Sequence, residues 1–135
     1  FLAVPAIGQP QSPTPLPRPE FPQPQFERKD WVNLNGSWQF AFDDQDAGLK
    51  EAWYAGGRRF DRQIVVPFAF ESPKSGIGDT AFHPVVWYQR DVTTPAAWKG
   101  RRVLLKFGAV DYRATAWLNG QKLGDHEGAR RSPST

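Results

Sequence analysis

The dipeptide Asn119-Gly120 constrains the fold of this chain more than any other pair of residues. It stands between two short runs of alternating side chains, where Asn-Gly is the strongest short-range signal for a two-residue type I′ turn. Asn tolerates the left-handed backbone that this turn needs at its first central position, and Gly adopts it at the second without steric cost. The stretch from Asp111 to Gly128 is therefore predicted to be one β-hairpin. Its first strand is expected to place Ala114, Ala116 and Leu118 on one face, and Thr115 and Trp117 on the other.

The segment from Ser37 to Phe42 is predicted to be the first strand of the fold. Its side chains alternate with the two-residue period of a strand, which puts Trp38, Phe40 and Phe42 on the same face. Aromatic side chains bury large apolar areas, so this face is expected to belong to the core. The acidic run over residues 43–46 that follows is expected to reach solvent.

The rest of the chain before the hairpin also favours strands. Strands are predicted over Gln63–Pro67, Val85–Val92 and Arg101–Phe107. A short helix or helical turn is predicted over Ala47–Tyr54, and a connector with one helical turn over Thr93–Gly100. Successive strands with short turns and little helix are typical of an antiparallel β-sandwich. The predicted fold class is therefore all-β.

The first 27 residues differ from the rest in composition. Most of the 13 prolines fall there, and Pro10–Pro24 is expected to be an extended, polyproline-type linker. The opening segment Phe1–Gly8 is apolar and ends in small residues, like the cleaved end of a secretory signal. Residues 1–27 are therefore expected to be a signal remnant and a Pro-rich linker, which implies a periplasmic or extracellular location. A plain disordered terminus is the alternative.

Charge and cysteine content exclude several classes of function. The net charge is +3, but the 17 Lys and Arg are interleaved with 14 Asp and Glu, and no basic stripe appears, so no nucleic-acid partner is expected. The chain has no cysteine, which excludes disulfides, thiolate metal sites and a cysteine nucleophile. No run of 18 apolar residues occurs, so no membrane span is predicted. No metal or other cofactor is expected.

Five short motifs follow one another along the chain: Leu34–Phe40, Val66-Pro67, Val86–Arg90, Phe107–Tyr112 and Ala116–Gly120. In this order they resemble the N-terminal sugar-binding domain of glycoside hydrolase family 2, which includes β-galactosidases, β-glucuronidases and β-mannosidases. Each motif is weak alone, but the ordered set is specific. The resemblance covers residues 28–128.

The resemblance implies a jelly-roll, galactose-binding-domain-like β-sandwich that precedes an immunoglobulin-like domain and a catalytic (β/α)₈ barrel. Such enzymes hydrolyse the O-glycosidic bond with retention, using two glutamates that the barrel carries. A barrel needs roughly 250 residues, more than the 135 of this chain. The chain is therefore expected to be a non-catalytic carbohydrate-binding domain, inactive alone, whose partners are carbohydrate and the downstream domains of a glycosidase.

The sandwich is expected to be incomplete at its C-terminus. In the family, the sequence His-Glu-Gly is usually followed by Gly-Tyr-x-Pro-Phe and by further strands, whereas here Gly128 is followed by an atypical tail, residues 129–135. The leading interpretation is a fragment of a retaining family 2 glycosidase. A free-standing carbohydrate-binding module and a non-functional frameshifted remnant are the alternatives.

Four residues are candidates for contact with the substrate. His83 begins the sequence His-Pro-Val-Val-Trp-Tyr, and the matching loop of the galactosidase branch resembles Asn-Pro-x-x-x-Tyr, whose first residue reaches toward the sugar. The resemblance also places Asp125, His126 and Glu127 at the edge that faces the catalytic domain. Consecutive residues of a strand point to opposite faces, so Asp125 and Glu127 are expected to share a side that His126 does not. A purely structural role is the alternative for all four.

Overall fold

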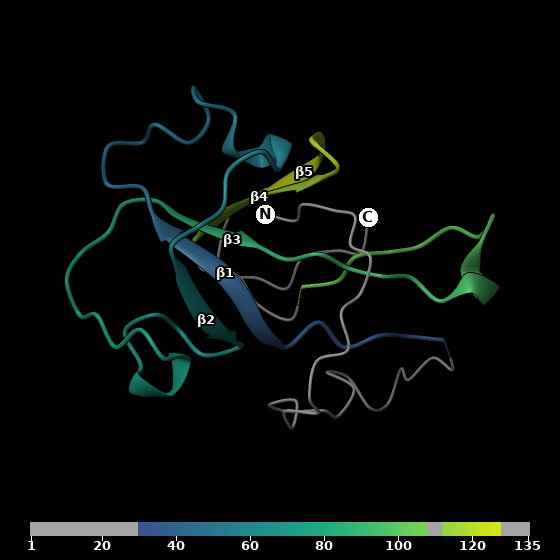
Figure 1. Ribbon diagram of the computed structural model, residues 1–135, viewed down its shortest axis with the longest axis horizontal. Coiled ribbons are helices and arrows are strands. Elements are labelled where there is room, and N and C mark those ends of the chain that lie inside the picture. Colours follow the sequence, from purple (N-terminus) through teal and green to yellow (C-terminus); the bar gives the residue numbers. More distant parts are fainter. Residues whose placement is uncertain (1–29, 108–111, 128–135) are drawn as a thin grey trace. The chain divides into compact units, whose positions relative to one another are not determined.

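The computed structural model describes residues 30–107 and 112–127, which form five strands and three single-turn 3₁₀ helices (Figure 1). No α-helix occurs within these ranges, and every strand pairing in them is antiparallel, so the all-β class is confirmed. The predicted N-terminal linker, residues 1–27, and the tail, residues 129–135, lie outside the described ranges. The elements are β1 (Gly36–Phe42), η2 (Trp53–Ala55), β2 (Arg62–Val66), η3 (Pro73–Ser75), β3 (Val86–Gln89), η4 (Ala96–Trp98), β4 (Arg113–Leu118) and β5 (Gln121–Glu127).

The elements fall into two compact units. The first, here called the sheet unit, contains the described residues 30–47 and 59–89, with β1, β2, η3 and β3. The second, called the hairpin unit, contains the described residues 48–58, 90–107 and 112–127, with η2, η4, β4 and β5. None of the described helices has the length and hydropathy that a membrane-spanning helix requires.

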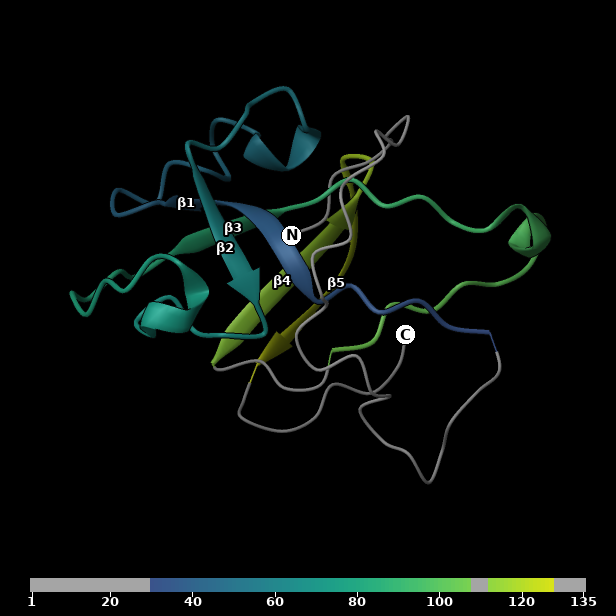
Figure 2. The ribbon, with the colours of Figure 1, turned by 60° about the horizontal axis from the view of Figure 1, so that its bottom comes forward.

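In the sheet unit, β1 lies between β2 and β3 and is antiparallel to both (Figure 1). Figure 2 shows the same strands from a second side, where β2 crosses in front of the other two. Phe40 sits in the middle of β1 and is fully buried, as is Ile64 on β2, and Trp38 is also buried. The Phe40 ring meets the rings of Phe42 and Tyr88 edge to face, at centroid distances of 5.0 and 5.1 Å. Such pairs of aromatic rings add to the stabilisation that burial provides. The predicted aromatic core face is confirmed at Trp38 and Phe40, whereas Phe42, at the end of the strand, is half-buried.

In the hairpin unit, β4 and β5 pair through the predicted turn. The φ angles of Asn119 and Gly120 are 53° and 78°, so both central residues have the left-handed backbone that the sequence predicted. The pairing register shifts between Ala116 and Trp117, and both side chains are buried. The shift leaves Leu123 of β5 without a paired residue on β4, which is typical of a β-bulge. Because Ala116 and Trp117 are both buried, burial does not distinguish the two predicted faces of β4 here, and their alternation stays a prediction.

The turn end of the hairpin packs against residues that come much earlier in the chain. The Trp117 indole stacks on Tyr54, with centroids 5.4 Å apart and ring planes 12° from parallel. A Cβ atom added to Gly120 would lie 3.7 Å from the Cα of Ala55, an ordinary contact distance. The segment around η2 thus gives the hairpin a packing partner within its own unit.

One predicted strand is absent from the structure. Residues 101–107 form no strand, although their side chains alternate. A strand needs a neighbour for its backbone hydrogen bonds, and β propensity mainly reports a fit to such a surface. The short helix or helical turn predicted over residues 47–54 is present as turns that lead into the 3₁₀ turn η2. A longer helix does not form there, since Ala52 has a φ of 53°, which interrupts a right-handed helix.

Candidate functional site

His83 lies in the loop between η3 and β3, where its imidazole packs into a group of aromatic rings. It stacks on Phe42 with ring centroids 3.6 Å apart and planes 18° from parallel. The Phe70 ring meets it edge-on, at 5.7 Å. Only 11% of the His83 side chain is exposed. Because Phe42 is the last residue of β1, this packing places His83 at the end of the central strand.

Two carboxylates approach the two ring nitrogens of His83. Its Nδ1 lies 2.7 Å from Oδ1 of Asp44, and its Nε2 lies 3.1 Å from Oδ2 of Asp79. The hydrogen bond with Asp44 is the largest cause of a raised pKa of His83; burial opposes it, and Asp79 adds to it. The pKa of Asp79 is lowered, first by the hydrogen bond that its carboxylate accepts from the backbone N–H of Ala81, and then by His83.

This geometry bears on the predicted contact between His83 and a sugar. Both nitrogens already face carboxylate oxygens, so a sugar hydroxyl has to displace Asp44 or Asp79 in order to bind the ring. The neighbouring Phe82, in contrast, is 88% exposed. The contact between His83 and sugar stays a prediction, and the same residue has a structural role in this arrangement.

Asp43 is a buried acid that the sequence analysis placed wrongly in solvent. Only 3% of Asp43 is exposed. Its Oδ2 accepts a hydrogen bond of 2.9 Å from Nε1 of Trp87, and its Oδ1 accepts one of 2.8 Å from the backbone N–H of Ala47. Its own N–H donates to the carbonyl of Val85. Buried polar groups are hydrogen-bonded, and these partners offset the loss of solvent around the carboxylate.

Sequence reasoning also missed the two acids beside His83. Asp79 stands four residues before His83, a spacing that is visible in the sequence but is informative only if the loop folds back. Asp44 stands 39 residues away, and no local pattern connects the two. For Asp43 a signal did exist: a buried Trp usually needs an acceptor for its indole N–H, and Trp87 was placed in a strand.

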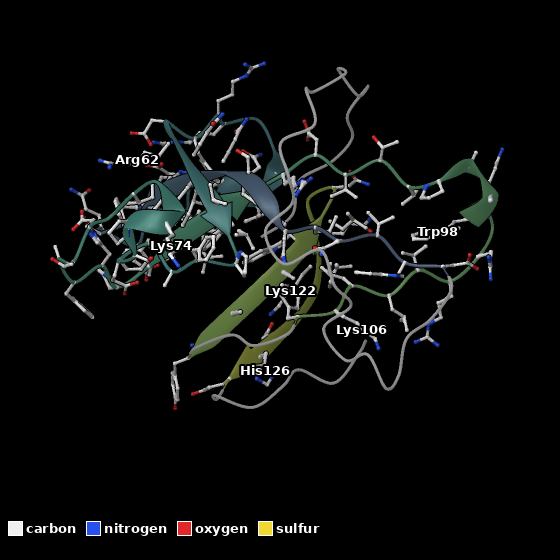
Figure 3. All side chains as sticks on the ribbon, turned by 90° about the horizontal axis from the view of Figure 1, so that it is seen from below. Arg62, Lys74, Trp98, Lys106, Lys122 and His126 are labelled. Atoms are coloured by element: carbon white, nitrogen blue, oxygen red, sulfur yellow. The ribbon has the colours of Figure 1, made fainter. Side chains whose placement is uncertain are left out.

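The other three candidates are neighbours on β5. Asp125 and Glu127 are exposed and His126 between them is half-buried, so the predicted alternation of faces is confirmed. Figure 3 labels His126 and Lys122 on this hairpin. The Nζ of Lys122 lies 2.6 Å from Oδ1 of Asp125, an exposed ion pair of small energetic value.

Among the described residues, no group of three or more His, Asp or Glu side chains has an arrangement that could hold a metal ion. Asp125 and Glu127 provide exposed carboxylate oxygens, which accept hydrogen bonds and so suit contact with hydroxyl groups.

The comparisons with known proteins agree on one family. Residues 31–134 match the family described as "Glycosyl hydrolases family 2, sugar binding domain", a range that includes most of the tail after Gly128. The chain is 34% identical over 114 residues to a beta-glucuronidase of Canis lupus familiaris, which covers 78% of this chain and 17% of that protein. It is 28% identical over 102 residues to a beta-glucuronidase of Paenibacillus borealis, which covers 71% of this chain and 16% of that protein.

A solved structure is also similar. It is a beta-glucuronidase from an uncultured Clostridium sp., with a TM-score of 0.55 and 30% sequence identity, and the match covers 71% of this chain and 17% of that one. The likeness supports a β-sandwich domain for the described strands. The chain spans 17% of the length of the first of the curated relatives it matches.

Proposed function

The chain belongs to the sugar-binding domain family of the family 2 glycosyl hydrolases, and on this premise we propose that it is the N-terminal carbohydrate-binding domain of a retaining glycosidase that acts on β-glucuronides. The observation that carries the proposal is the family match over residues 31–134. The choice of β-glucuronides rests on the relatives, which are beta-glucuronidases of a mammal and of a bacterium.

In this proposal the chain binds and positions carbohydrate but breaks no bond. Retaining hydrolysis needs two carboxyl groups about 5–5.5 Å apart on either side of the glycosidic bond. We assign them to a downstream barrel, reached through an immunoglobulin-like domain. The fraction of the relatives that this chain spans, 17%, supports this division of labour.

The proposed contacts with sugar come from the hairpin and from one loop. Asp125 and Glu127 lie exposed on β5 and would accept hydrogen bonds from hydroxyl groups, with the half-buried His126 between them. His83 would donate to a sugar only after exchanging one of its two carboxylate partners. The hairpin residues are therefore the first to test.

An assay of turnover tests the non-catalytic part of the proposal. The purified chain is incubated with 4-nitrophenyl β-D-glucuronide, and no release of nitrophenol above the buffer rate is expected. The β-D-galactoside serves as the matched second substrate. Turnover of either compound by the chain alone would contradict the assignment of both carboxyl groups to another domain.

Binding is tested by following backbone amide NMR signals during a titration with D-glucuronate, and in parallel with D-galactose. Glucuronate is expected to shift the amides of residues 125–127, and an Asp125→Asn/Glu127→Gln double variant is expected to lose these shifts. Glu71→Gln is the control, since Glu71 is also exposed but lies in the sheet unit. An absence of shifts with both sugars in the wild-type chain would overturn the binding role.

The gene tests the proposed context. Continuing the reading frame past Thr135 is expected to reveal an immunoglobulin-like sandwich and then a barrel with an Asn-Glu strand end. A stop codon at that point would instead support a free-standing carbohydrate-binding module. A shifted frame that restores Gly-Tyr-x-Pro-Phe would support a frameshifted remnant.

Export to the periplasm or the outside of the cell is proposed from residues 1–27, which lie outside the described ranges. The codons upstream of Phe1 are then expected to encode Lys or Arg, as the charged start of a secretory signal requires. Upstream codons without such residues would remove this part of the proposal.

A further inference from the structure

The loop that enters β3 is fastened to the end of β1 by a charged side chain, and we propose that this fastening is a latch controlled by a single proton. The latch consists of His83 with its two partners, Asp44 and Asp79. It holds the loop segment 79–85, including the exposed Phe82, against the end of the central strand. The inference concerns the sheet unit alone and does not rest on the proposed sugar-binding function.

The first step is the shape of the loop before His83. Asp79 closes a tight turn, because its Oδ1 accepts a hydrogen bond of 2.8 Å from the backbone N–H of Ala81. Its own N–H donates to the carbonyl of Phe70, at 3.1 Å. The same carboxylate offers its second oxygen, Oδ2, to Nε2 of His83. Asp79 therefore organises the loop and at the same time fixes one side of the imidazole.

The second step is the connection to β1. Asp44 comes two residues after Phe42, the last residue of the strand, and its Oδ1 lies 2.7 Å from Nδ1 of His83. The imidazole also stacks on the Phe42 ring itself. Asp44 thus contacts the edge of the His83 ring, and Phe42 contacts its face. The loop remains in place there as long as both nitrogens keep their partners.

The third step is the protonation state that this geometry requires. A neutral imidazole has one donor nitrogen and one acceptor nitrogen, whereas an ionised carboxylate only accepts. Between Asp44 and Asp79, the neutral form loses one hydrogen bond and turns a lone pair toward a carboxylate oxygen. The imidazolium donates to both acids, so the latch is complete only when His83 is charged.

The charged groups around the latch agree with this requirement. Asp44 reaches His83 from the turn after β1, and Asp79 reaches it from the loop. On β2, the positive charge of Arg62 acts on Asp79, and its guanidinium carbon lies 5.0 Å from the centroid of the Phe42 ring. Phe42 and Phe70, the rings packed against the imidazole, carry no charge. Two negative charges and one positive charge thus lie near His83, and this balance favours the charged imidazolium.

The pH window of the latch follows from the directions of two pKa shifts. The pKa of His83 is raised, mainly by the hydrogen bond with Asp44, so its contribution to stability is complete below the ordinary value of 6.5 and is lost as pH rises through the raised pKa. The pKa of Asp79 is lowered, mainly by the backbone hydrogen bond from Ala81, so its contribution is present above 3.8 and is lost as pH falls through the lowered pKa. The latch is therefore closed between these ordinary values and opens on the alkaline side above 6.5.

The chain is well suited to a direct test, because it contains no cysteine and only two histidines. A Phe82→Cys variant carries a nitroxide spin label at an exposed position, with no competing thiol. Electron paramagnetic resonance then measures the mobility of the loop between about pH 5 and pH 9, the range in which a histidine titrates. The label is expected to be restrained at the acidic end and to become mobile in a one-proton transition with its midpoint above 6.5.

Three further substitutions in the labelled chain separate the latch from other effects of pH. His83→Asn is expected to leave the label mobile at every pH. Asp44→Asn is expected to move the midpoint to lower pH, because it removes the largest cause of the raised pKa of His83. His126→Asn, at the only other histidine, is expected to keep the wild-type transition. Far-UV circular dichroism checks that each variant keeps its strands.

A second measurement tests the proposal on the wild-type chain: the NMR signal of the His83 ring proton at Cε1 is followed as a function of pH. Its titration midpoint is expected above 6.5, at the same pH as the mobility transition. A midpoint at or below 6.5 overturns the latch, even if the His83→Asn chain fails to fold. The proposal is also overturned if label mobility does not change with pH, or if the same transition persists in His83→Asn.

Discussion

The sheet of β2, β1 and β3 and the hairpin of β4 and β5 are both antiparallel, yet different interactions determine their structures. The sheet is built around Phe40 and Ile64, fully buried side chains that lie opposite residues distant in sequence. The hairpin depends on two neighbouring residues with left-handed backbone, and most of β5 is exposed. The comparison shows that burial holds one region together, whereas local backbone preference defines the other.

The two regions also differ in how they use acidic side chains. In the sheet unit, Asp43, Asp44 and Asp79 each accept hydrogen bonds from within the fold. On the hairpin, Asp125 and Glu127 are exposed, and Asp125 pairs with an exposed lysine. The three acids of the sheet unit connect segments of the fold, whereas Asp125 pairs with a residue of its own strand.

The largest effect is expected when a buried side chain is removed from the core of the sheet. Phe40→Ala is expected to lower the free energy of unfolding by about 3–5 kcal/mol, because it removes a fully buried ring and leaves a cavity. Urea denaturation followed by circular dichroism measures the change. Phe82→Ala is the matched control and is expected to stay within about 0.5 kcal/mol of wild type, since Phe82 is 88% exposed. Similar losses in both variants would show that burial does not dominate the sheet.

A smaller effect is expected from the buried acid at the end of β1. In Asp43→Asn the side chain keeps its shape, but both carboxylate oxygens accept from donors, so the new amide NH₂ must face either Trp87 Nε1 or the N–H of Ala47. The free energy of unfolding is expected to fall by about 1–3 kcal/mol. Asp46→Asn is the control: Asp46 is exposed and has a φ of 53°, which Asn tolerates. An unchanged stability of Asp43→Asn would mean that solvent reaches this carboxylate.

The smallest of the three effects tests the hairpin. Gly120→Ala puts a Cβ on a residue with φ of 78° and is expected to destabilise by about 1–2 kcal/mol. Steric contact contributes little, because the nearest atom is 3.7 Å away. Gly57→Ala, in the same unit but outside the left-handed region and with open space around it, is expected not to destabilise. If the two variants are equally stable in thermal denaturation, the left-handed turn does not determine the hairpin.

Prediction from the sequence succeeded where one side chain or dipeptide carries a strong local signal. The strand from Ser37 to Phe42 follows from alternating aromatic residues, and the turn follows from Asn119-Gly120. It failed over residues 101–107, where the side chains alternate but the backbone forms no strand. Alternation reports which side chains can face a core, but a strand also needs a neighbour, which a local pattern does not supply.

In the candidate site, too, the local features could be predicted from the sequence and the long-range contacts could not. The alternation of Asp125, His126 and Glu127 follows from the two-residue period of a strand and from nothing else. The surroundings of His83 do not, because one partner is 39 residues away and becomes a neighbour only when the loop and β1 meet.

For this chain the amino-acid sequence alone determined the core face of β1 and the turn at Asn119-Gly120, since each depends on residues close together in the chain. It also determined the all-β class and the family resemblance, which depend on the order of such local patterns along the chain. Only the tertiary structure decided that Asp43 is buried beneath the indole N–H of Trp87 and that His83 lies between two acids. The physical reason is that burial, charge pairing and pKa depend on distances through space. Those distances are set when strands far apart in the sequence come together.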